Sequence, residues 1–324
     1  FKDFGARCMA GFMAGALTDV EEKTILVATS GDTGSAVADG FSGFDRIHVV
    51  LLYPRGQVSP TQERQLVVRR EGVTTFAVDG TFDDCQRIVK EVFARENRDQ
   101  RFTSANSINV GRLLPQMTYY FWAAHHLREE LFRCCVPSGN LGNLTAGVLA
   151  HLSGIGPARF LAAHNANRFF PEFLESGDET YTRSVQTLSN AMDVGVPSNF
   201  ERLRHVLSPS AMTDLIWGTS VTDAETLATM RDVYEATGYV ADPHTAVGFE
   251  AIRRHRVESG DRGPVALMST AHPAKFPEAV RAALGFEPDV PERLAAYWRR
   301  DTQSSVIGPE ADLLLSALHE AGIC

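Results

Sequence analysis

The residue at the start of the chain whose chemistry stands out is Lys2. It lies between Phe1 and Phe4 and is followed by a run rich in alanine and glycine at 5–15. This pattern indicates an amine at the start of a partly buried helix. Lysines are rarely buried, and burial lowers the pKa of an amine so that it can act as a base or form a Schiff base with a carbonyl. Alone, Lys2 is also compatible with a solvated terminal lysine.

Two turns combine glycines with the end of an apolar run. Residues 29–34 (TSGDTG) follow the run 23–28, and residues 137–143 (PSGNLGN) follow the run 132–136. A glycine-rich turn between a strand and a helix directs backbone N–H groups and the helix dipole at an anion. The first turn alone is as compatible with a plain structural connection. The second is the stronger signal, and it fits a phosphate monoester better than a dinucleotide because no GxGxxG motif is present.

Histidines and cysteines do not indicate a metal site. His125 and His126 are adjacent on a predicted helix, so they face different directions, and we interpret them as surface residues. The cysteines are odd in number and lack CxxC spacing, which argues against both zinc and a disulfide framework. The five are Cys8, Cys85, Cys134, Cys135 and Cys324. We therefore expect no metal ion.

Alternating strand and helix patterns must position these residues. Apolar, partly β-branched runs predict strands at 23–28, 46–53, 73–78, 132–136 and 160–163. A further strand at 264–268 leads to a hydroxyl-bearing turn at Thr270, and one helix is expected at 184–192. This alternation predicts an α/β fold with parallel sheets flanked by helices. Ligands of such folds bind at the carboxyl ends of the strands, where the three turns lie.

Together these residues are the parts that pyridoxal phosphate needs. Lys2 supplies an amine for a Schiff base, residues 139–143 supply a phosphate cup, and Thr270 supplies a hydroxyl for the pyridine nitrogen. The sequence therefore favours a site for this cofactor over a nicotinamide or nucleotide site.

Length and composition agree with a two-lobed enzyme. The chain has 324 residues, which is longer than most chains with a single hydrophobic core. Its fractions of 44% hydrophobic and 22% charged residues are those of a soluble globular protein. The net charge of -9 and the dispersed basic residues argue against a nucleic-acid partner. No run of 18 apolar residues and no secretory pattern is seen, so we expect no membrane partner and a cytoplasmic location.

Seven motifs in register resemble the threonine synthase family. They are FKDFG at 1–5, TSGDTGSAVA at 29–38, ANSIN at 105–109, PSGNLGNLTAG at 137–147, AMDVGVPSN at 191–199, DPHTAVG at 242–248 and TAHPAKFPEAV at 270–280. The resemblance spans residues 1 to about 282, and seven motifs in the same order are far more specific than any one of them.

This resemblance implies a fold-type II pyridoxal-phosphate enzyme, similar to the tryptophan synthase β-subunit. Such an enzyme has two open parallel-sheet lobes flanked by helices, with the cofactor between them. We expect a small mobile lobe at 1–102 and a large cofactor-binding lobe at 103–324. Family members have a substantial region before the lysine motif, so we expect the N-terminal part of the small lobe to be missing here. A monomer or a homodimer is expected.

The resemblance also assigns roles to residues. Lys2 would form the Schiff base and act as the catalytic base, and Thr270 would meet the pyridine nitrogen. The cofactor phosphate would be held by Gly139, Asn140, Leu141, Gly142 and Asn143, with Leu141 at a position where the family commonly has an aromatic residue. The α-carboxylate of the substrate would be held by Ser30, Gly31, Asp32 and Thr33.

The implied reaction converts O-phospho-L-homoserine and water into L-threonine and phosphate. It requires loss of an α-proton and a β-proton, expulsion of the γ-phosphate and addition of water at Cβ. A dianionic substrate phosphate needs charge-assisted donors, and we expect these from a polar segment and one separate arginine. The candidates are Asn106, Ser107, Asn109 and Arg112, with Arg55 as a second choice.

Two other functions remain open from the sequence. A phospholyase or deaminase of the same fold would use the same lysine and release 2-oxobutyrate. A non-catalytic relative would bind a phosphorylated metabolite without turnover. For His244 and His272 we favour capping or packing over proton transfer, and we expect Asp3 and Asp242 to stabilise a helix end or a turn.

Overall fold

The computed structural model describes residues 2–17, 22–96, 101–127 and 132–323. Phe1 and Cys324, named above, lie outside these residues. By contacts, the chain divides into two compact units. The first comprises Phe1–Pro115 and Val290–Cys324, and the second comprises Gln116–Asp289. The boundary expected after residue 102 falls at the start of β4 (Phe102–Ser104). Each unit is described separately.

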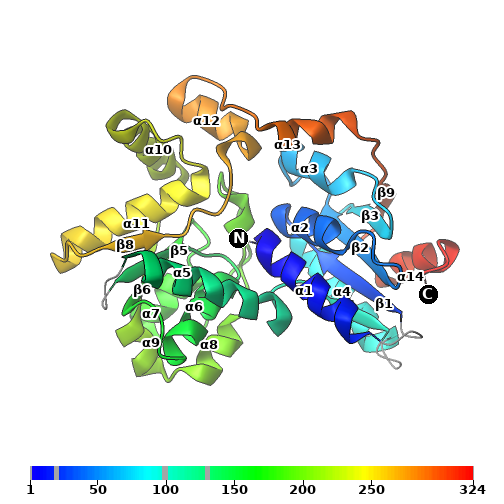
Figure 1. Ribbon diagram of the computed structural model, residues 1–324, viewed down its shortest axis with the longest axis horizontal. Coiled ribbons are helices and arrows are strands. Elements are labelled where there is room, and N and C mark those ends of the chain that lie inside the picture. The colour runs from blue at the N-terminus through cyan, green and yellow to red at the C-terminus, as the bar shows by residue number, and fades with distance from the viewer. Residues whose placement is uncertain (1, 18–21, 97–100, 128–131, 324) are drawn as a thin grey trace. The chain divides into compact units, whose positions relative to one another are not determined.

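The first unit is built on a parallel sheet of five strands in the order β4-β1-β2-β3-β9. The strands are β1 (Lys23–Ala28), β2 (Ile47–Pro54), β3 (Val73–Val78), β4 and β9 (Ser305–Ile307). Figure 1 shows β9, from the far end of the sequence, beside β3. The β-branched runs form the central strands because both of their faces are buried.

Helices cover both faces of this sheet. The helices of the unit are α1 (Lys2–Ala16), α2 (Asp32–Phe41), α3 (Pro60–Val67), α4 (Phe82–Glu96), α13 (Glu292–Ala295) and α14 (Ala311–Glu320). Ile25 and Val27 pack in one core with residues of α1 and α2, whereas Leu26 and Ala28 pack in another with residues of α4 and α14. This alternation is the period of two expected of a strand buried on both faces.

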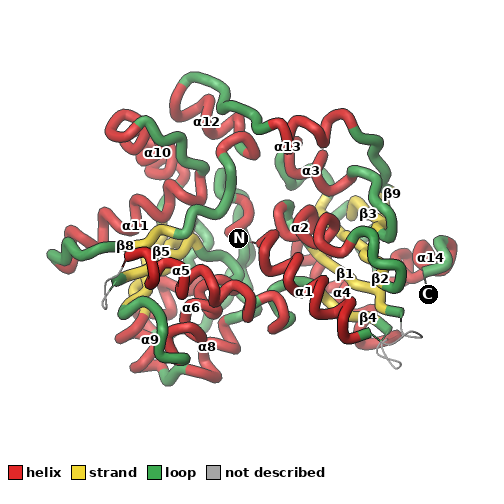
Figure 2. Tube along the Cα trace, viewed as in Figure 1, coloured by secondary structure: helices red, strands yellow, loops and turns green. Residues whose placement is uncertain are grey.

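The second unit has a parallel sheet of four strands in the order β7-β6-β5-β8. They are β5 (Arg133–Pro137), β6 (Arg159–His164), β7 (Ile216–Ser220) and β8 (Val265–Leu267). The helices are α5 (Met117–Leu127), α6 (Gly142–Leu152), α7 (Phe169–Ser176), α8 (Phe200–Val206), α9 (Pro209–Leu215), α10 (Asp223–Thr237), α11 (Pro243–Ser259) and α12 (Pro277–Leu284). Figure 2 shows these strands among the helices of the unit.

The helix expected at 184–192 is wrong. The structure has no helix or strand at 177–187 and a single 3-10 turn at Asn190–Met192. The side chains of Asn165 and Asn167 explain the difference, because they bond to this segment in place of a helix. Asn167 Nδ2 donates to Val185 O at 3.0 Å, and Asn167 Oδ1 accepts from Val185 N at 2.8 Å. Side-chain amides thus satisfy backbone groups that a helix would have paired internally.

Candidate cofactor and substrate site

The turn at Gly139–Asn143 connects β5 to α6 and has the geometry of an anion site. Leu141 adopts φ 58, and among the described residues it is the one non-glycine residue with positive φ. It precedes α6, whose start carries no side-chain cap, so the first-turn amides have no acceptor within the helix. These amides and the helix dipole favour a negatively charged group.

Gly139 leaves no space for a side chain at the base of this turn. A Cβ on Gly139 would lie 2.6 Å from Met192 Cα and 3.0 Å from Met192 O. The backbone of Met192 therefore forms a wall against which the turn is packed, and only glycine allows that approach.

Asn140 is held by a second remote segment. Its Oδ1 accepts hydrogen bonds from Ser198 N at 2.6 Å and from Ser198 Oγ at 2.9 Å. Asn199 Nδ2 donates to Asn140 O at 3.0 Å. The motif at 191–199 therefore contacts the turn at both ends, through Met192 and through Ser198 and Asn199.

The side chain of Asn143 faces the core. Tyr120 Oη donates to Asn143 Oδ1 at 2.7 Å, and Asn143 Nδ2 donates to Gln116 Oε1 at 3.0 Å. Burial raises the pKa of Tyr120 well above its ordinary value, so the phenol stays protonated and remains a donor. Asn143 thus anchors the first turn of α6, and its backbone amide is the group available to a ligand.

Thr270 lies beyond β8 and is half-buried. The residue before it, Ser269, is placed by two hydroxyl contacts. Its Oγ lies 3.2 Å from Thr245 Oγ1 and 3.3 Å from Tyr239 Oη. The Thr270 turn is therefore tied to the start of α11.

The turn at residues 29–33 in the first unit is built around a buried hydroxyl. Thr29 Oγ1 accepts from Gly31 N at 3.0 Å and from Gly34 N at 2.9 Å, and it donates to Gly31 O at 3.1 Å. Gly31 has φ 134, a conformation that favours glycine. Gln62 Nε2 donates to Asp32 Oδ1 at 3.4 Å, which turns this carboxylate toward α3. A bound carboxylate would then meet backbone amides and hydroxyls rather than Asp32 Oδ1.

Lys2 begins α1 and is half-buried. Arg112 Nη2 donates to Lys2 O at 3.2 Å, and Arg112 Nη1 donates to Ala105 O. Arg112 is only 1% exposed, so its guanidinium is packed inside the first unit. It joins the lysine helix to the segment 105–112.

The other candidates for the substrate phosphate make local contacts. Asn106 Nδ2 donates to Ala28 O at 2.7 Å, and Asn109 Nδ2 donates to Ser104 O at 3.0 Å. Arg55 Nη1 lies 3.1 Å from Asp79 Oδ1, with both side chains more than half exposed. The structure links Lys2 to the segment 105–112 through Arg112. It gives Arg55 a different partner.

The acid and histidine residues for which we favoured structural roles have them. Asp242 caps α11 by accepting from His244 N at 3.0 Å. His272 caps a 3-10 turn, its Nδ1 accepting from Ala274 N at 3.2 Å. Asp3 pairs with Arg7 on the exposed face of α1 at 2.8 Å. The capping interpretation is confirmed for Asp242 and His272.

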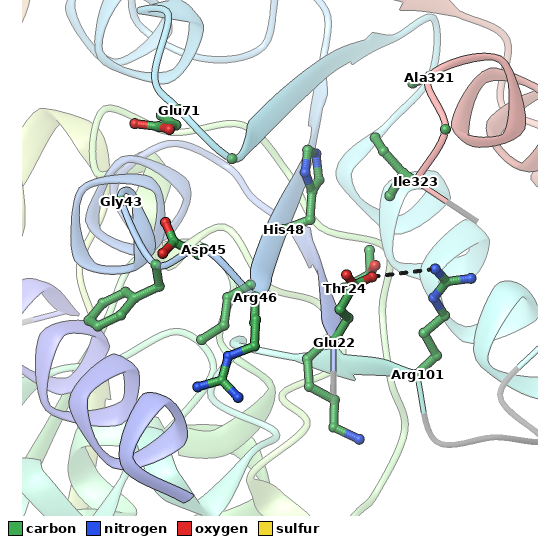
Figure 3. A pocket seen from close by; sticks show the side chains of 15 residues that line it. Glu22, Thr24, Gly43, Asp45, Arg46, His48, Glu71, Arg101, Ala321 and Ile323 are labelled. Carbon is green, nitrogen blue, oxygen red and sulfur yellow. Dashed lines mark ion pairs between the residues drawn. The ribbon is translucent and has the colours of Figure 1, made fainter. Parts of the chain in front are cut away.

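The first unit also contains a pocket of about 370 Å³, lined by residues other than those described above. Figure 3 shows Thr24 and His48, from the starts of β1 and β2, with Ala321 and Ile323 from the chain after α14. Arg101 Nη2 and Glu22 Oε2 approach to 3.8 Å across it. These positions are at the amino ends of the strands, opposite to the turns at the carboxyl ends, and none of the predicted site residues lines this pocket.

Two further observations concern metal ions and membranes. Across the described ranges, no group of three or more His, Cys, Asp or Glu side chains is arranged to hold a metal ion. No helix in that same part of the chain is long and apolar enough to cross a membrane.

Sequence reasoning missed the residues that support the two turns. Thr29, Gln62 and Met192 act through packing or hydrogen bonds inside the protein, and their types carry no chemical signal. Thr29 lay in the motif at 29–38, and Met192, Ser198 and Asn199 lay in the motif at 191–199, so their place in a motif was the available signal, which Gln62 did not have.

Family models and known proteins match this chain over most of its length. A model described as "Pyridoxal-phosphate dependent enzyme" matches residues 1–270, and one described as "Threonine synthase, C-terminal" matches residues 245–316. Threonine synthase of Serratia marcescens is 44% identical over 301 residues, which cover 91% of this chain and 69% of that protein.

Solved structures give the same result. A crystal structure of threonine synthase from Escherichia coli has a TM-score of 0.89 and 40% identity, and the match covers 99% of this chain and 75% of that chain. A pyridoxal-phosphate-bound threonine synthase from Brucella melitensis has a TM-score of 0.88 and 33% identity, with the same coverage. The predicted fold-type II architecture and the predicted cofactor are confirmed. The chain belongs to the threonine synthases, a family of pyridoxal-phosphate-dependent enzymes.

Proposed function

We propose that this protein converts O-phospho-L-homoserine and water into L-threonine and phosphate. The observation that carries the proposal is the turn at Gly139–Asn143, where Leu141 has φ 58 and the start of α6 carries no side-chain cap, so that its first-turn amides can bind an anion. This donor set fits the phosphate of pyridoxal phosphate, which needs several N–H groups without side-chain obstruction. When bound, the cofactor supplies an electron sink that stabilises negative charge on substrate carbons.

Within this proposal, Gly139, Asn140, Leu141, Gly142 and Asn143 hold the cofactor phosphate through backbone amides, and the hydroxyl of Thr270 meets the pyridine nitrogen. The support is the contacts that fix the turn and the position of Thr270 after Ser269. A neutral hydroxyl does not keep a proton on the ring as a carboxylate would, which makes the ring a milder electron sink.

Lys2 would bind the aldehyde carbon of the cofactor through Nζ. When the substrate amine takes its place, the freed amine removes the α-proton and later a β-proton. The hydrogen bond from Arg112 to Lys2 O supports this role, because it restrains the first turn of α1. Arg112 is thereby proposed as a positioning residue for Lys2.

The substrate would be oriented by its two anionic groups. Ser30, Gly31, Asp32 and Thr33 hold the α-carboxylate, with the first-turn amides of α2 as the principal donors. For the γ-phosphate we propose Ser107 and Arg55 as contacts, with Asn106, Asn109 and Arg112 shaping the segment. If the Michaelis constant for O-phospho-L-homoserine were unchanged in both S107A and R55Q, Ser107 and Arg55 would not be contacts of the γ-phosphate.

The deciding experiment supplies the protein with pyridoxal phosphate and O-phospho-L-homoserine and separates the products. Threonine and phosphate in equal amounts are expected, and K2A should lose the activity together with the absorbance of bound cofactor. A majority of 2-oxobutyrate would establish a phospholyase instead. Bound cofactor without any product would establish a binding protein.

We also propose that the protein acts in the cytoplasm as a monomer or a homodimer. The finding that supports the location is the lack of a membrane-crossing helix in the described residues. Light scattering of the purified protein would decide between one and two chains, and a larger assembly would contradict both.

A further inference from the structure

Three polar residues at the start of α11 are almost completely buried. Asp242 is 0% exposed, His244 is 2% exposed and Thr245 is 1% exposed. Buried polar groups are stable only when their hydrogen bonds are satisfied, so each contact of this cluster constrains the segment at its other end. The contacts lead to two separate segments of the second unit.

The first contact fixes the protonation pattern of His244. Ala191 N donates to His244 Nε2 at 3.2 Å, so this nitrogen carries no proton. His244 Nδ1 lies 2.8 Å from Asp242 Oδ1 and must therefore be the protonated nitrogen that donates to the carboxylate. The imidazole is neutral, with its tautomer set by Asp242, and it offers an acceptor to the backbone of residue 191.

Ala191 is adjacent to the wall of the phosphate turn. The next residue, Met192, is the one whose Cα would lie 2.6 Å from a Cβ on Gly139. Farther along the same segment, Ser198 N and Oγ donate to Asn140. The bond between Ala191 and His244 therefore anchors a segment that contacts the turn at Gly139 and at Asn140.

The second contact leads to the Thr270 turn. Thr245 Oγ1 donates to Asp242 Oδ2, so its remaining role toward Ser269 Oγ, 3.2 Å away, is that of acceptor. The ring of His244 also packs against Phe276, with ring centroids 4.9 Å apart. Asp242 is thus bonded to both His244 and Thr245. His244 bonds to the segment that packs on Gly139, and Thr245 contacts Ser269, which precedes Thr270.

We propose that Asp242, His244 and Thr245 form a positioning cluster that sets the phosphate turn and the Thr270 hydroxyl at a fixed spacing. The cluster does not touch the cofactor. It acts through Ala191 and Met192 on one side and through Ser269 on the other. The inference rests on the proposed roles of the Gly139 turn and Thr270.

The test compares two variants of His244 that each keep one of its hydrogen bonds. H244Q has a carbonyl near the position of Nε2 and retains an acceptor for Ala191 N, whereas H244N has an amide near the position of Nδ1 and retains only the bond to Asp242. Pyridoxal phosphate is titrated into each apoprotein, and the ³¹P NMR shift of its bound phosphate is recorded. H244N should bind about tenfold more weakly, the effect of one lost hydrogen bond, with a displaced ³¹P signal. H244Q should stay within about threefold of the parent.

Controls separate this role from a loss of stability. H255N removes another buried histidine of α11, which packs against Trp217 far along the helix. It should lower the melting temperature of the apoprotein without moving the ³¹P shift. T245V should alter the absorbance of the bound pyridine ring and leave the ³¹P shift in place, because it removes the contacts of Thr245 to Asp242 and Ser269 and keeps the bond between His244 and Ala191.

Equal affinities and equal ³¹P shifts for H244N, H244Q and the parent would overturn the positioning cluster. A displaced ³¹P signal in H255N as large as that in H244N would also overturn it. If the parent protein itself shows no bound ³¹P signal, the proposed phosphate turn is wrong, and that failure is distinct from the failure of the cluster.

Discussion

The two glycine turns that follow β1 and β5 have similar sequences and are stabilised by different parts of the chain. The turn at residues 29–34 is held mainly by Thr29, whose hydroxyl bonds to Gly31 and Gly34 within the turn. The turn at 139–143 is held from a distance. Met192 packs on Gly139, and Ser198 bonds to Asn140. The first turn is held mainly from within, with one further bond from Gln62 to Asp32, and the second is held by a segment that lies at 192–199 in the sequence.

The two turns should therefore be sensitive to substitutions in different parts of the chain. A local turn is disturbed mainly by changes to its own backbone and to its one internal acceptor. A turn supported by remote segments is also disturbed by changes in those segments, including the histidine cluster on α11. The three predictions that follow test this contrast.

The largest effect is expected from adding a methyl group at the base of each turn. In G139A the new Cβ meets the backbone of Met192, which cannot move aside, and we expect roughly 3 kcal/mol of destabilisation and about 100-fold weaker pyridoxal phosphate binding. In G31A the Cβ meets the end of the Gln62 side chain, and the cost comes from φ 134, about 1–3 kcal/mol. G31A should raise the Michaelis constant for substrate and keep cofactor affinity. Urea unfolding and cofactor titration measure both, and equal cofactor affinities would contradict the contrast.

Low pH should lower the free energy of unfolding through His164, which lies next to the contacts that support the turn at 139–143. This residue ends β6 and precedes Asn165, which braces Ser189 and Asp193. In the described part of the chain, His164 Nε2 has no hydrogen-bond partner, and burial lowers the pKa of His164 to about 3. The unfolded chain takes up this proton near pH 6.5, so the contribution to stability is complete above pH 6.5 and is lost as the pH falls toward 3.

Between pH 7 and pH 5 this loss amounts to about 2 kcal/mol. H164L should show a shallower fall in unfolding free energy over that interval, measured by urea titration at each pH. The same fall in H164L and in the parent would exclude His164 as the source.

The smallest effect is expected from the internal acceptor of the first turn. T29V keeps the shape of the side chain and removes the acceptor for Gly31 N and Gly34 N, at a cost of about 1–2 kcal/mol. T29S keeps the hydroxyl and serves as the control. T29V should raise the Michaelis constant for O-phospho-L-homoserine about tenfold, and T29S should stay near the parent. An equal increase in both variants would contradict this role of the hydroxyl, because T29S keeps the acceptor and loses only the methyl group.

The sequence was sufficient to predict the long strands and the order of the motifs. The runs at 23–28, 73–78 and 132–136 are apolar because both faces of their strands are buried, and they appear as β1, β3 and β5. Three short strands were not predicted, β4, β7 and β9. The segments of β4 and β9 contribute three residues each, too few to show a period, and they are strands because a neighbouring strand offers hydrogen bonds.

The chemical residues were predictable because lysine, paired glycines and hydroxyls carry a signal in their types. Their supports were not. Met192 is a hydrophobic residue like many others, and only the folded chain reveals that its backbone closes on Gly139. The same applies to His244, for which we favoured capping or packing, because the sequence gave no indication of its bond to Ala191.

The discontinuity of the first unit has a consequence for the order of synthesis. Residue 305 begins β9, which pairs with β3, and Arg64 bonds to the carbonyl groups of Tyr297 and Trp298. A ribosome releases these residues only after the whole of Gln116–Asp289. During translation, the outer edge of β3 therefore lacks its partner strand while the second unit is being synthesised. All residues of the second unit are thus synthesised before the first unit has its last strand, and an unpaired strand edge such as that of β3 is a site for pairing with other chains.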